Sequence, residues 1–187
     1  DYKTDQTITM GKLDHIGQKE QDFIAQQKMF FVATAPDSGK INLSPKGIDS
    51  FRVINENHVV WLNLTGSGNE TQAHVDENGR MIIMMCAFEG APNILRLYGK
   101  AVSILPTHEK WVELASLFPP TKGSRQIISL KVDLVQNSCG FGIPYYDYKG
   151  DRDTLGLWAE KKGDDGVREY QELKNTTSID GKSIRID

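Results

Sequence analysis

Short runs of apolar and β-branched residues, separated by turn-forming residues, dominate the middle of this chain. Candidate strands cover residues 29–35, 40–43, 51–54, 58–64, 80–87, 93–103 and 125–136. In the last run, Ile128, Leu130, Val132 and Leu134 alternate with polar residues, which is the period of a strand with one buried face. Many strands with few helices between them favour a closed antiparallel barrel, because closure removes the exposed edges of a sheet.

Helical segments are expected around this set of strands. They cover residues 17–28, a short stretch that ends near Asp76, residues 107–118 with Thr107 as the N-cap, and residues 151–162 and 167–174. We therefore predict a mainly β fold, a β-barrel with flanking helices, as a single domain over residues 10–187 with a C-terminal helical segment. Residues 1–9 precede Met10, a candidate native start, and are expected to be a tag or a flexible arm.

The composition argues against several classes of partner. With 187 residues, of which 39% are apolar and 25% charged, the chain has enough apolar side chains for a sizeable core. A net charge of −3 without a dense basic stretch argues against nucleic acid, and no apolar run reaches the roughly 18 residues of a membrane span. The two cysteines, Cys86 and Cys139, form no paired motif, so a reducing, cytoplasmic location is expected.

A glycine-rich segment over residues 65–71 follows the candidate strand 58–64 and precedes a short helix. The glycines Gly66 and Gly68 let backbone N–H groups point one way, Ser67, Asn69 and Thr71 add short polar side chains, and a helix N-terminus attracts anions. The segment therefore predicts a phosphate-binding site, although the capped start of an ordinary helix would give the same pattern. A dinucleotide fingerprint fits poorly because a threonine stands where the third glycine belongs.

No catalytic constellation stands out in the sequence. Glu70 and His74 share a helix face, but no third ligand is evident, so no metal site is expected. No nucleophile elbow surrounds any serine, and Ser67 has no convincing base partner. Catalytic residues therefore remain unassigned.

Five motifs occur in an order that resembles the pyridoxamine 5'-phosphate oxidase-like FMN-binding split-barrel family. They lie at residues 43–47, 65–71, 80–90, 95–99 and 138–144, and the resemblance runs from about Met10 to Asp180. The resemblance implies a six-stranded antiparallel split barrel of the FMN-binding type. It also implies a homodimer that holds FMN at the interface between its two protomers.

The resemblance assigns the flavin ring to the end of the second barrel strand. Lys46 and Gly47 would lie near the ring, and Leu43 and Ser44 would contact its isoalloxazine edge. A cation near the pyrimidine end of a flavin stabilises the reduced, anionic ring. The alternative interpretation of Lys46 is a solvated lysine in a turn.

Three further positions follow from the resemblance. Trp61 and Leu62 match strand residues whose backbone lines the same cleft, although Trp61 is equally consistent with a core residue. Arg96 matches a strand arginine that reaches either the phosphate or a carboxylate.

The sequence of the predicted phosphate-binding site differs from the family pattern. Where family oxidases have a Ser-Arg-Lys run, this chain has Asn69, Glu70 and Thr71. We therefore expect backbone amides and the short side chains, rather than cations, to bind the phosphate. Glu70 is expected to turn outward or back toward an N-cap amide.

The substrate side departs further, because no histidine follows His108 and the family's substrate-binding arginine-and-histidine motif is missing. The chain is therefore not expected to be a genuine pyridoxamine phosphate oxidase. Aromatic residues lie there instead and would either cover the partner's flavin or pack the dimer seam: Phe141, Tyr145, Tyr146 and Tyr148.

The resemblance thus implies an FMN-dependent oxidoreductase that acts on an unidentified small-molecule substrate or electron donor. One alternative is a flavin carrier or sensor without turnover. Another is a split barrel that binds a deazaflavin or haem, and the lack of a histidine in the cleft motifs counts against haem.

Overall fold

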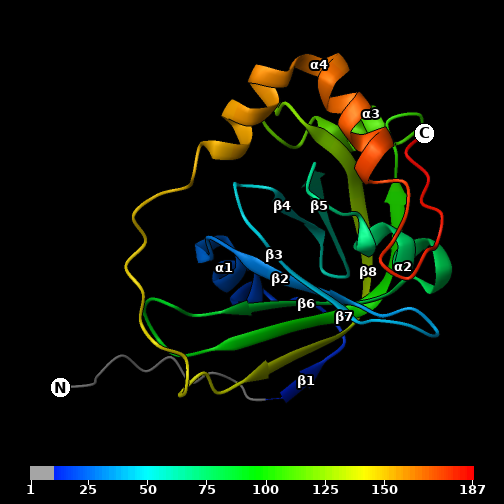
Figure 1. Cartoon of the computed structure of the whole chain (residues 1–187). Helices are drawn as coiled ribbons and strands as arrows, with labels where there is room; N and C mark the ends of the chain where they lie inside the picture. The colour runs from blue at the N-terminus through cyan, green and yellow to red at the C-terminus, as the bar shows by residue number, and fades with distance from the viewer. Residues whose placement is uncertain (1–10) are drawn as a thin grey trace.

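The computed structural model describes residues 11–187, which form one antiparallel sheet with four helices around it (Figure 1). The strands follow the order β3-β2-β6-β7-β8-β5-β4, and β1 pairs with β8 beside this path. The strands are β1 Gly11–Leu13, β2 Phe30–Thr34, β3 Asn42–Lys46, β4 Phe51–Asn55, β5 His58–Leu64, β6 Arg80–Cys86, β7 Ile94–Ile104 and β8 Ser124–Ser138. The helices are α1 Gln18–Gln26, α2 Glu70–Asn78, α3 Trp111–Ala115 and α4 Thr154–Lys174.

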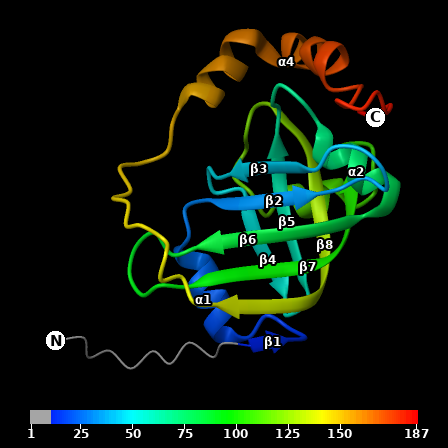
Figure 2. The same ribbon diagram turned by 60° about the horizontal axis from the view of Figure 1, so that its bottom comes forward.

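The strand β8 organises the sheet, since it pairs with three others. Along one edge it pairs with β7, and along the other edge it pairs first with β5 and then with β1. The sheet curls around a core and stays open between its edge strands, β3 and β4 (Figure 2). This confirms the predicted mainly β split-barrel class, with eight strands among residues 11–187 where six were expected.

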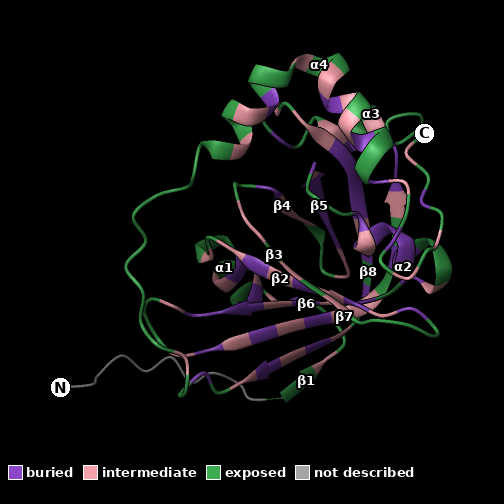
Figure 3. Cartoon of the chain, in the orientation of Figure 1, coloured by how far each residue is buried: buried purple, intermediate pink, exposed green. Residues whose placement is uncertain are grey.

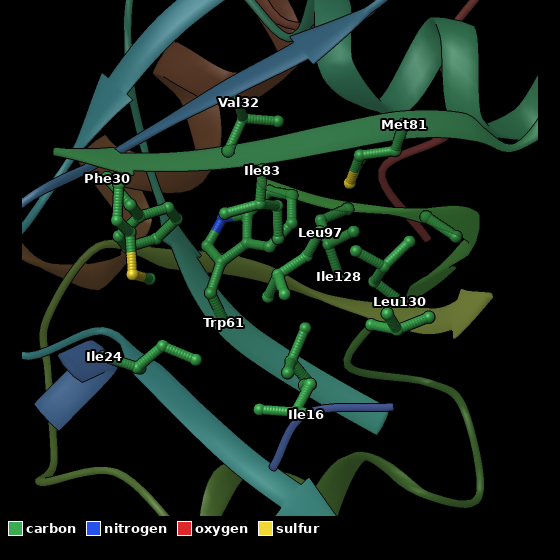
Figure 4. Packing of buried hydrophobic residues seen from close by; sticks show 14 of the residues in the cluster. Ile16, Ile24, Phe30, Val32, Trp61, Met81, Ile83, Leu97, Ile128 and Leu130 are labelled. Carbon is green, nitrogen blue, oxygen red and sulfur yellow. The ribbon is translucent and has the colours of Figure 1, made fainter. Parts of the chain in front are cut away.

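The larger core lies inside the curled sheet, around Trp61. This side chain is 0% exposed, and its ring centroid lies 6.0 Å from that of Phe30, which in turn lies 4.9 Å from the Phe51 ring (Figure 4). Val60 and Leu62, which alternate with Trp61 along β5, belong to a second apolar cluster with α3. Both faces of β5 are therefore buried (Figure 3).

The helix predicted over residues 107–118 is present but shorter, and the prediction of Thr107 as its N-cap is wrong, since Lys110 is the N-cap. Residues 105–110 form turns, in which the N–H of His108 donates to the carbonyl of Leu105 at 2.9 Å and the N–H of Trp111 donates to that of His108 at 2.9 Å. As a result, α3 begins only at Trp111 and spans five residues.

The two predicted C-terminal helices form one element, α4. Its backbone breaks at Gly163, where φ is 69° and ψ is 170°, so the predicted end of the first helix coincides with a kink. After α4, residues 175–187 return to lie beside α2 (Figure 1). The C-terminal region thus reaches the same end of the barrel as the glycine-rich segment.

Candidate functional site

The glycine-rich segment connects β5 to α2, as the sequence predicted, and Thr65 anchors its start. The N–H and the Oγ1 of Thr65 both donate to the carbonyl of Gly123 at 2.8 Å. Gln171 of α4 donates from Nε2 to the Thr65 Oγ1 at 2.8 Å. Thr65 is buried, whereas residues 66–68 are exposed, so the tip of the loop is open to a ligand.

Two buried side chains hold the carbonyl groups of this loop. Asn175 donates from Nδ2 to the carbonyl of Gly66 at 3.0 Å, and Arg125 donates from Nη1 to the carbonyl of Gly68 at 2.9 Å. The same nitrogen of Arg125 donates to the Asn175 Oδ1 at 2.6 Å. Within the described part of the chain, the backbone N–H groups of residues 66–69 have no hydrogen-bond acceptor.

The side chains of Asn69 and Thr71, which were expected to contact the phosphate, are buried and bonded within the chain. Asn69 accepts from Gln126 Nε2 at 2.8 Å and donates to Gln72 Oε1 at 2.9 Å. The Thr71 Oγ1 accepts from Asn42 Nδ2 at 3.1 Å. An anion at the loop tip would therefore meet backbone N–H groups and the exposed serine first, and cofactor contacts of these two side chains stay predictions.

Glu70 takes a different position from either of the two that we expected. Its Oε1 accepts from the N–H of Ile179 at 2.9 Å, so the carboxylate faces the C-terminal segment rather than solvent or an N-cap amide. The other oxygen, Oε2, is buried and has no hydrogen-bond partner in the part of the chain that the structure describes. This contact keeps one carboxylate oxygen bound to the C-terminal segment.

The residues of β3 divide between the two faces of the sheet. Lys46 pairs with Phe30, a core residue, so Ser44 and Lys46 face inward. Leu43 faces outward and is 67% exposed. Gly47 follows β3 and, together with α1 and β4, lines a cleft of about 520 Å³.

Lys46 is a partly buried lysine rather than a solvated one. Its Nζ donates to the Asn63 Oδ1 at 3.1 Å. Burial, together with the nearby charge of Arg125, lowers the pKa of Lys46 from 10.5 to about 8. The amine therefore stays mostly protonated at neutral pH but loses its proton far more readily than a surface lysine.

A second cation, Arg125, is 5% exposed in the same region. Burial lowers the pKa of Arg125 to about 10. Among the described residues, neither Arg125 nor Lys46 forms an ion pair with a carboxylate. Two buried donors nearby, the Arg125 Nε and the Asn63 Nδ2, also have no acceptor within residues 11–187. Such a set of cations and unpaired donors fits an anionic ligand.

The remaining predicted positions lie elsewhere. The Trp61 side chain is buried in the larger apolar cluster and the Leu62 side chain in the second one. Any contact of these two residues with a cofactor would therefore be made by their backbone atoms. Arg96 pairs with Met84 on the outer face of the sheet and donates from Nη1 to the Ser138 Oγ at 2.7 Å. Within one chain it lies on the opposite face from Lys46, and its contact with the phosphate stays a prediction.

Sequence reasoning missed Arg125, Asn63 and Asn175. Arg125 is only the first residue of a predicted strand, and Asn175 follows the end of a predicted helix, so neither belongs to a recognisable motif. The one available signal was a cation at the start of an otherwise apolar strand. Among residues 11–187, no three or more His, Cys, Asp and Glu side chains lie together in a group that could hold a metal ion.

Comparison with known proteins identifies the class to which this fold and site belong. Residues 16–139 match the family model described as pyridoxamine 5'-phosphate oxidase. The pyridoxamine 5'-phosphate oxidase family protein ustO of Aspergillus flavus is 37% identical over 180 residues, which cover 86% of this chain and 72% of ustO. The chain therefore belongs to the pyridoxamine 5'-phosphate oxidase family, as its motifs predicted.

Solved structures support the same fold. A HupZ variant from Group A Streptococcus is 21% identical, with a TM-score of 0.54, and the match covers 66% of this chain and 99% of HupZ. A putative pyridoxamine 5'-phosphate oxidase from Lactobacillus delbrueckii is 15% identical, with a TM-score of 0.54, and the match covers 67% of this chain and 98% of that protein. At these identities the likeness concerns the fold alone.

A search of residues 11–187 for a helix of at least 18 residues with membrane-like hydropathy finds no candidate membrane span.

Proposed function

We propose that this protein binds FMN and acts as an FMN-dependent oxidoreductase on an unidentified small molecule. The observation that carries the proposal is the loop at residues 66–69, whose backbone N–H groups have no acceptor among the described residues. The loop lies at the end of the barrel that also holds Lys46 and Arg125, two cations that form no ion pair with a described carboxylate. An anionic ligand with a phosphate and a polar ring satisfies both features. Membership of the family supports FMN as that ligand.

In this proposal the loop binds the phosphate through its backbone N–H groups and the Ser67 hydroxyl. The flavin supplies hydride or electron transfer when bound. Lys46, whose Nζ donates to Asn63, would place a positive charge near the ring and would favour its reduced, anionic form. Because the pKa of Lys46 is about 8, its Nζ can also release a proton near neutral pH.

We further propose that the protein is a homodimer that packs through the outer face of the sheet. Cross-strand pairing places Leu43, Ala33, Ile82, Tyr98 and Leu134 in one continuous row across five strands. All five side chains are exposed or only half-buried. A contiguous apolar row on the outside of a sheet is typical of a protein interface, and a second copy would cover it.

The absorbance spectrum of the purified protein, with and without added FMN, tests the proposal. We expect flavin absorbance bands that stay with the protein through gel filtration, and tighter binding of FMN than of riboflavin, which lacks the phosphate. Absence of flavin binding at micromolar concentration would refute the proposal. Anaerobic reduction by NADH or NADPH then separates an enzyme from a carrier, because a carrier binds FMN without turnover.

A further inference from the structure

We infer that Asn175 and Arg125, which we call the clamp, are positioning residues that set the glycine-rich loop for phosphate binding. The inference rests on the proposed function and adds to it a residue outside the family match, since Asn175 lies 36 positions beyond the last matched residue, 139. Asn175 is 0% exposed and directly follows α4.

The geometry of the peptide group connects the clamp to the ligand side of the loop. A trans peptide is planar, and its C=O and N–H point in opposite directions. The clamp holds the carbonyl of Gly66 through Asn175 and the carbonyl of Gly68 through Arg125. The N–H groups of the same two peptides, which belong to Ser67 and Asn69, therefore point away from the clamp.

The two anchors act together because they are bonded to each other. Arg125 donates to the Asn175 Oδ1 at 2.6 Å, so both carbonyls are drawn toward one place and both N–H groups are turned to the opposite side. Ser67 and Asn69 belong to a run of successive residues, 66–69, whose N–H groups have no acceptor in the described chain, and successive N–H groups can form a backbone concavity that binds anions. The loop is not crowded at its glycines, since a Cβ at Gly66 would lie 3.9 Å from the Gly68 carbonyl oxygen and a Cβ at Gly68 would lie 3.9 Å from the Glu70 Oε1.

The clamp also explains how a loop without its own cation can hold a phosphate. Arg125 lies behind the loop and does not need to touch the anion, because it orients the peptide dipoles that do. The C-terminal segment reinforces the arrangement on α2, where Gln72 donates from Nε2 to the carbonyl of Arg185 at 2.5 Å. The loop is thus held from a region remote in sequence, since Asn175 lies 109 positions after Gly66.

Substitution Asn175→Asp tests the clamp with minimal change of shape. An aspartate keeps the acceptor for Arg125 but replaces the donor to Gly66 by an oxygen that repels the carbonyl. We expect FMN affinity to fall about tenfold or more, while riboflavin affinity changes less than about twofold. Thr176→Ala is the matched control, because within the described chain the Thr176 hydroxyl donates only to the carbonyl of Glu172.

Amide NMR spectra of the full chain without ligand provide the second readout. In the Asn175→Asp protein, the N–H resonances of Ser67 and Asn69 should shift, and in the Thr176→Ala protein they should not. If the wild type fails to distinguish FMN from riboflavin, the proposed function fails, and these shifts still decide whether the clamp orients the loop. Should Asn175→Asp not fold, Asn175→Ser replaces it, since its hydroxyl is too short to keep the bond to Gly66.

Unshifted loop resonances in a folded variant would overturn the inference. Equal losses of FMN and riboflavin affinity would also overturn it, because a merely structural defect lowers both affinities alike.

Discussion

Substitution Lys46→Met tests whether the amine at the end of β3 is buried as the structure indicates. The unfolded chain holds the Lys46 proton up to a pKa of 10.5, whereas the folded protein holds it only up to about 8. Between these values the unfolded state binds more protons, so the free energy of unfolding rises as the pH rises. A shift of this size contributes about 1 kcal/mol between pH 7 and pH 9 and about 3 kcal/mol over the full range.

The variant removes this contribution at the cost of one hydrogen bond. Methionine carries no charge to bury, but the Asn63 Oδ1 loses its donor, which costs about 1–3 kcal/mol. We therefore expect Lys46→Met to be at least as stable as the wild type at pH 7. Its advantage should shrink by about 1 kcal/mol by pH 9, because the wild type gains stability with pH and the variant does not.

Urea unfolding of both proteins at pH 7, 8 and 9, at constant ionic strength and followed by circular dichroism, measures this difference. Lys19→Met, on the exposed part of α1, controls for the loss of one positive charge. A difference between wild type and Lys46→Met that stays constant from pH 7 to pH 9 would refute the reasoning. It would mean that the Lys46 amine is solvated.

Two further substitutions test the sheet itself. Gly99→Ala should destabilise the protein by several kcal/mol in urea unfolding, because the new Cβ would lie 1.9 Å from the backbone oxygen of Lys131. The control is Gly142→Ala, whose Cβ would meet no described atom within 4 Å and should change the free energy of unfolding little. Similar losses of stability for both variants would contradict the close approach of β7 and β8. Ile82→Asp should shift the sedimentation of the proposed dimer toward the monomer, whereas Ile54→Asp on β4 should not, and an unchanged mass for Ile82→Asp would argue against the outer face as the interface.

The fold was largely predictable because its strands carry local signals. Along β8, Ile128, Leu130 and Val132 alternate with polar residues and enter the larger core, as predicted. Leu134, predicted on the same face, lies on the outer face instead, because the register of β7 and β8 shifts before it, and Val135 enters the core in its place. β1 was missed because only Leu13 of its three residues is apolar, and its extended form depends on pairing with Val135, more than a hundred positions away. The sequence of a three-residue segment does not indicate pairing with a strand so far away in the chain.

The site was predictable only in the parts that belong to motifs. Lys46 and the loop at residues 65–71 were found from local sequence and family resemblance, and both lie at one end of the barrel. The bond between Arg125 and Gly68 spans 57 residues, and the bond between Arg125 and Asn175 spans 50. Neither residue type is unusual at its position, so only the folded chain shows that the two meet.

The separation of Asn175 from the family match has a practical consequence for where this protein can be divided. The match ends at residue 139, just after the last strand, and a fragment cut there would keep every strand of the sheet. It would lack α4 and the segment beyond it, and with them the contacts from Gln171 and Asn175 to the glycine-rich loop. The part of the chain that the family model matches is thus smaller than the unit that holds the glycine-rich loop in place, so a fragment should extend at least through Asn175 to keep these hydrogen bonds.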